Sequence, residues 1–142
     1  MKTMRSLLIC ALALVATGCD GILGSDDDDN FTFSAQRTEY TEGMVNEAEV
    51  SALVRTIQID GIFLLPHSCH TLRGNLNRNQ RGEVDVVITA TSNNTTCQPE
   101  IHAMDYRLQT FGYSRGFYRV RVFHEIVGQP RELITQADIL IE

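Results

Sequence analysis

Alternating apolar and polar residues run through most of this chain and predict short β-strands. The clearest is segment 117–124, in which Tyr118, Val120 and Val122 face one way and the intervening arginines face the other. Residues 101–111 alternate in the same manner, and residues 133–141 begin and end on apolar positions that bound a last strand. Short strands separated by turn residues every eight to twelve positions or so are typical of an antiparallel β-sandwich.

Segment 69–97 predicts a β-hairpin around which the other strands are arranged. Every second residue from Leu72 to Leu76, and again from Val84 to Ala90, is small or apolar, with a polar turn at residues 77–82 between the two runs. A period of two places each run on one face of its strand. The hairpin is therefore expected to bury one side against a second sheet.

Residues 45–57 are ambiguous between two kinds of element. Val50, Leu53, Val54 and Ile57 fit one face of a helix, whereas the alternation that starts at Ala48 fits a strand. We favour a strand because the rest of the chain is β and a lone helix fits a sandwich poorly.

The remaining segments complete an all-β domain. Residues 31–34 predict a short strand, residues 36–43 a loop, and residues 55–65 a strand that Gly61 interrupts and Pro66 ends. The fold class expected for residues 31–142 is an antiparallel β-sandwich of seven to eight strands.

The first thirty residues have a different character from the rest. A basic start is followed by the apolar run 7–16, which is too short for a stable membrane span and is typical of a secretory signal peptide. The sequence Leu14-Val-Ala-Thr-Gly-Cys19 resembles the lipobox of bacterial lipoproteins. The resemblance implies removal of residues 1–18 and lipidation of Cys19, and two acyl chains make membrane attachment stable. The alternative is an ordinary cleaved signal with a coincidental cysteine.

Residues 19–30 predict an acidic tether. They contain five aspartates and two glycines, a composition that cannot form a buried core and remains flexible. The chain is thus expected to consist of a signal peptide (1–18), a tether (19–30) and a folded domain (31–142).

One strand carries a second resemblance. Gly116-Phe-Tyr-Arg-Val-Arg-Val122 resembles the Gly-x-Tyr-x-Val-x-Val strand of bacterial immunoglobulin-like and transthyretin-like modules. That resemblance implies that the hydroxyl of Tyr118 ties a loop near the start of the strand to the sheet. Together with the lipobox and the two-cysteine hairpin, it makes the chain similar to small uncharacterised bacterial lipoproteins. The resemblance implies an immunoglobulin-like β-sandwich but no particular activity.

Composition narrows the choice of partner. The 142 residues carry a formal net charge of −6, which argues against nucleic-acid binding and against electrostatic docking on an anionic membrane. The only lysine is Lys2, so no lysine remains after signal cleavage for Schiff-base chemistry.

Cys69 and Cys97 are the only cysteines left once the signal peptide is removed and Cys19 is lipidated. Export exposes them to an oxidising compartment, so they are expected to form a disulfide. The bridge would close the open end of the hairpin and contribute about 3–4 kcal/mol by restricting the unfolded chain.

The alternative for these residues is a metal site formed by His67, Cys69 and His70, with His102 and His124 as further ligands. The spacing matches no established zinc framework, and neighbouring strand residues point to opposite faces. No metal and no cofactor are therefore expected. His124 continues the apolar stripe of its strand and is expected to be a core histidine.

No catalytic constellation stands out. The chain contains no Gly-x-Ser-x-Gly motif, and a Cys/His pair would need a reduced thiolate, so an enzyme is not expected. The leading hypothesis is a lipid-anchored, non-enzymatic binding or structural module facing the periplasm or the cell exterior, with an envelope protein or glycan as partner. The alternative is a periplasmic protease inhibitor or chaperone-like module that binds through loops 77–82, 92–98 and 112–116.

Overall fold

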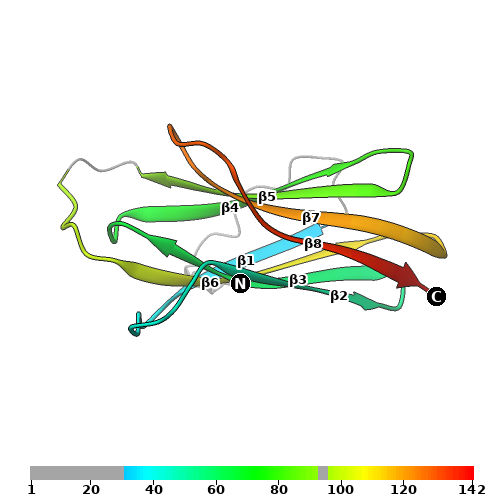
Figure 1. Ribbon diagram of the computed structural model, residues 1–142, viewed down its shortest axis with the longest axis horizontal. Coiled ribbons are helices and arrows are strands. Elements are labelled where there is room, and N and C mark those ends of the chain that lie inside the picture. The colour runs from blue at the N-terminus through cyan, green and yellow to red at the C-terminus, as the bar shows by residue number, and fades with distance from the viewer. Residues whose placement is uncertain (1–30, 93–95) are drawn as a thin grey trace, which may run out of the picture.

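The protein, described here from a computed structural model covering residues 31–92 and 96–142, is a sandwich of two four-stranded sheets (Figure 1). The predicted signal peptide, Cys19 and the acidic tether lie outside the described residues. The sandwich prediction is confirmed, with eight strands. Sheet A has the order β1 (Phe31–Thr38), β6 (His102–Phe111), β3 (Thr56–Leu65), β2 (Glu47–Leu53), and sheet B has the order β4 (His70–Arg78), β5 (Glu83–Ser92), β7 (Gly116–Ile126), β8 (Glu132–Ile141).

One strand pair departs from the antiparallel expectation. Strands β5 and β7 are parallel, whereas the other five neighbouring pairs are antiparallel. The reason is the path of the chain, because after β5 it leaves sheet B, crosses to sheet A and runs back along the sandwich as β6. β7 then starts at the same end as β5 and lies beside it.

The core lies between the two sheets and follows the alternation in the sequence. In the hairpin of β4 and β5, Leu72 pairs with Ala90 and Leu76 with Val86, which confirms the predicted common face. Burial of these apolar stripes is the main source of stability, at about 25 cal/mol for each Å² removed from water. The largest fully buried apolar side chains are Ile57, Ile59, Leu65, Ile88, Leu108, Ile141, Val84, Val86, Val120 and Val122.

The ambiguous segment 45–57 is extended, and its helical interpretation is wrong. It contains β2, a tight turn at residues 54–55 and the first residues of β3. Val50 lies opposite Ile59 in the register and packs against the core, which a helix in this edge position could not do. The turn, which the alternation did not reveal, places Arg55 in the left-handed region at φ 54°.

Two further boundaries differ from the sequence prediction. β1 continues to Thr38, so the predicted loop from residue 36 begins later than expected. β3 runs without a break through Gly61, which lies opposite Tyr106 in the register. The ring of Tyr106 occupies the space that a Cβ at position 61 would need. Gly61 therefore permits a close approach of ring and backbone instead of interrupting the strand.

The role expected for Tyr118 is confirmed. Its hydroxyl donates a hydrogen bond to the carbonyl of Ser114 at 3.0 Å. Its ring makes an edge contact with Tyr113 at 4.9 Å between centroids, and the guanidinium of Arg78 lies 4.3 Å from the centre of the Tyr113 ring. These contacts fix the connection between β6 and β7 against the start of β7.

The two ends of the sandwich carry different connections, seen at the left and right of Figure 1. We call the end with the β1–β2, β3–β4, β5–β6 and β7–β8 connections the disulfide end. The opposite end, where β1 begins, is the far end, and the guanidinium of Arg78 joins the sheets there by donating to the carbonyl of Phe111 at 3.0 Å. Loops 77–82 and 112–116 lie at the far end, whereas Ser92 and residues 96–98 lie at the disulfide end. The loops named for the inhibitor alternative therefore lie at both ends of the sandwich.

Candidate functional site

Cys69 and Cys97 form the expected disulfide, with their Cα atoms 5.9 Å apart. Cys69 directly precedes β4, and Cys97 follows β5 in the connection to β6. The last residue pair of the hairpin is His70 with Ser92, so the bridge closes the hairpin just beyond its final backbone pairing. The connection between the sheets is thereby fixed to β4.

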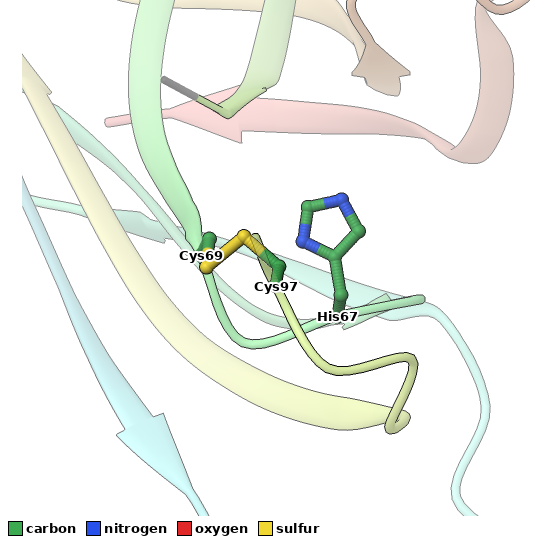
Figure 2. Close-up of side chains that lie close together, drawn as sticks. All are labelled: His67, Cys69 and Cys97. Carbon is green, nitrogen blue, oxygen red and sulfur yellow. A yellow bond between two sulfur atoms is a disulfide. The ribbon is translucent and has the colours of Figure 1, made fainter. Parts of the chain in front are cut away.

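One histidine lies beside this bridge, and two more follow it in a row. In Figure 2 the imidazole of His67 lies beside the two sulfur atoms, and one ligand atom from each of these three residues lies within 4.8 Å of the others. The ring of His70 stacks on that of His67 at 3.9 Å between centroids, and its Nδ1 lies 3.0 Å from the carbonyl oxygen of His67. The ring centroid of His102 lies 6.5 Å from that of His70.

The residues that lie together therefore differ from the metal ligands that the alternative hypothesis predicted. His67 and Cys69 come together as that hypothesis required, but Cys97 takes the third place and His70 does not join the group of atoms. His124 lies elsewhere, in the core between the sheets. The expectation that Cys69 and His70 would not share an ion agrees with this arrangement.

His102 is the most shielded imidazole at the disulfide end. It is 7% exposed. Burial lowers the pKa of His102, and the nearby positive charge of Arg37 lowers it further. The guanidinium of Arg37 also donates to the carbonyl of Ser68 at 2.6 Å. The imidazole of His102 is thus neutral at neutral pH and lies near the positive charge of Arg37.

His124 is a core residue, as its sequence position predicted. It is 2% exposed, its ring stacks on Phe63 at 4.0 Å, and its Nε2 is hydrogen-bonded to the hydroxyl of Tyr106 at 2.9 Å. Burial lowers the pKa of His124 to about 4 and raises the pKa of Tyr106. Both groups are neutral between pH 5 and 9 or so, which suits a structural pair.

A second candidate site is a groove of about 720 Å³ on the outer face of sheet A. All four strands of the sheet line it, and the register sets the outward side chains in rows across them. Asp60 forms a salt bridge with Arg107 at 2.5 Å. The lining includes four carboxylates and one guanidinium, so the groove is acidic: Glu47, Glu49, Asp60, Asp105 and Arg107.

The outer face of sheet B differs in its charge. The guanidinium of Arg121 donates twice to Asp85, at 2.7 and 2.8 Å, and Arg119 donates to Asp138 at 2.8 Å. The hydrogen bond from Arg119 lowers the pKa of Asp138. Because these charges are paired across strands, the acidic excess of the domain is concentrated on sheet A. Alternation alone did not reveal the groove, because its residues come from four separate strands.

The chain matches no protein-family model, and the searches of curated proteins and of solved structures returned no match. Among residues 31–92 and 96–142, no helix combines the length and the apolar composition needed to cross a bilayer.

Proposed function

We propose that this protein is a lipid-anchored, non-enzymatic binding module of the bacterial cell envelope, attached at Cys19 and facing the periplasm or the cell exterior. The lipobox-like sequence that ends at Cys19 supports the anchor. The disulfide between Cys69 and Cys97 supports export, because such bridges persist in oxidising compartments. The two features support different parts of the proposal, since the disulfide bears on export and only the lipobox-like sequence bears on attachment.

The direction of β1 gives this module an orientation. β1 begins at the far end of the sandwich, so a tether over residues 19–30 would enter the domain there. Twelve residues span at most about 40 Å when fully extended. The far end would then be the attached end of the domain, with the disulfide end at the opposite end of the sandwich. The groove on sheet A would lie along the side of the domain, open to a partner in the same compartment.

The groove is the single observation that carries the binding role. It offers a concave surface of about 720 Å³ whose rim bears four carboxylates. Complementary charge steers association and selects partners. We therefore propose that the partner is an envelope protein that presents a basic, extended segment to sheet A. A glycan is the less favoured occupant, because the chain has no tryptophan and the one aromatic residue lining the groove, Tyr106, is buried.

Crosslinking in intact cells tests this proposal. A photoreactive residue at Ile62, which lines the groove, is expected to capture one protein partner, whereas the same residue at Arg73, exposed on β4 of sheet B, is expected to capture none. Adding Glu49→Lys to the Ile62 probe should reduce the crosslinked product at least tenfold, because it places a positive charge at the rim facing the basic segment.

The matched control is Glu132→Lys, which makes the same charge change at an exposed position of β8 that does not line the groove. The crosslink should survive this substitution. Equal capture from Ile62 and Arg73, or equal loss with both lysine substitutions, would refute a specific site on sheet A. Capture of a glycan instead of a protein would show that the proposed class of partner, an envelope protein, is wrong.

A further inference from the structure

The disulfide end concentrates metal-binding side chains. Five of the six histidine and cysteine residues between positions 31 and 142 lie there, and only His124 lies elsewhere. Thiolate and imidazole are the ligands that zinc and other thiophilic ions prefer. This clustering goes beyond what a structural disulfide requires.

The geometry of three of these residues fits one ion. The ligand atoms of His67, Cys69 and Cys97 lie within 4.8 Å of one another. Ligands of a tetrahedral zinc ion lie about 3.5–3.8 Å apart, because Zn–S bonds are about 2.3 Å and Zn–N bonds about 2.0–2.1 Å long. Once the sulfurs are no longer bonded to each other, the change needed to reach these separations is about 1–2 Å.

We propose that reduction of the Cys69–Cys97 bridge converts the disulfide end into a site for a thiophilic metal ion. The thiolate, not the disulfide, is the sulfur form that binds metals, so the site exists only in the reduced protein. A dithiol reductant supplies two electrons and two protons: its own thiols become a disulfide while the Cys69–Cys97 bond breaks into two thiols. Metal binding then displaces both thiol protons, and the imidazole of His67 supplies the third ligand.

The surroundings suit this role. Nδ1 of His67 is buried and has no hydrogen-bond partner among the described residues, which leaves it available to an ion. The stacked ring of His70 holds the His67 ring in place. The guanidinium of Arg37 donates to the carbonyl of Ser68 and so fixes the backbone next to Cys69. Two thiolates would leave the site with enough negative charge to bind a divalent cation beside this arginine.

Calorimetric titration with Zn²⁺ tests the proposal on the full mature protein in detergent. After anaerobic reduction with a phosphine, we expect about one zinc ion per chain and release of about two protons, measured from the dependence of the heat on the buffer. Without the reductant, affinity should fall at least a hundredfold. His67→Gln should weaken binding to the reduced protein at least tenfold, whereas Thr71→Ala, which is close to Cys69 but removes no ligand, should leave affinity unchanged.

Three results would overturn the proposal. Equal affinity with and without the reductant would assign binding to imidazoles alone. Unchanged affinity in the His67→Gln variant would mean that the two thiols bind zinc without His67. The third result is unfolding of the reduced protein, which circular dichroism of each sample detects. A reduced protein that loses its β signal and does not regain it with Zn²⁺ contradicts a folded metal site.

Discussion

Replacing both Cys69 and Cys97 with serine is expected to lower the free energy of unfolding by about 3–4 kcal/mol. The bridge joins residues 28 apart in the sequence, and in the unfolded chain it removes the conformational freedom of that loop. It also fixes the β5–β6 connection to the start of β4, where the hairpin would otherwise fray. Chemical denaturation followed by circular dichroism, with and without the substitutions, measures the difference.

The reductant provides the matched control for this experiment. A phosphine should destabilise the native protein by the same amount and leave the double serine variant unaffected, because that variant has no bridge to break. A loss below about 1 kcal/mol in the variant would mean that the bridge contributes little to the stability of the sandwich. A variant that remained sensitive to the reductant would point to a different cause of the effect.

Acidification is expected to remove about 3 kcal/mol of stability through His124 alone. In the folded protein burial lowers the pKa of this imidazole to about 4, whereas the ordinary value of 6.5 applies to the unfolded chain. Between these two values the unfolded state binds more protons than the folded state. Stability is therefore fully present above about pH 6.5 and falls as the pH decreases toward 4.

The variant His124→Gln isolates this contribution. Other groups also titrate in this range, but they do so in both proteins, so the relevant quantity is the difference between the two pH dependences. Denaturant unfolding at pH 7.5 and at pH 4 should show a loss at least about 2 kcal/mol smaller in the variant. Parallel pH profiles for the two proteins would show that the imidazole is not held neutral by its contacts with Phe63 and Tyr106.

Sequence reasoning succeeded where the signal is local. The alternation of Tyr118, Val120 and Val122 predicted a strand and its buried face, since strand geometry fixes which residues point together. The pairing of Cys69 with Cys97 followed from export chemistry and from the hairpin between them. These features depend on neighbouring residues or on a short loop.

The features that were missed depend on contacts between distant segments. The acidic groove needs β1, β2, β3 and β6 side by side, and nothing in the sequence states that order. The parallel pairing of β5 with β7 follows from the crossing of the chain to sheet A at β6, which alternation cannot indicate. In the sequence, only residue type associates His102 with His67, and only the pairing of Leu65 with His102 explains why it lies at the disulfide end.

The most direct test of the central claim is the intact mass of the protein extracted from the membranes of cells that produce it naturally. The account predicts a chain that begins at Cys19, carries a diacylated glyceryl group there, and lacks two hydrogen atoms because Cys69 and Cys97 are bonded. Alkylation without prior reduction should add nothing to that mass. A chain that retains residues 1–18, or one that lacks lipid and takes up alkyl groups at Cys19, Cys69 and Cys97, would contradict export and anchoring together.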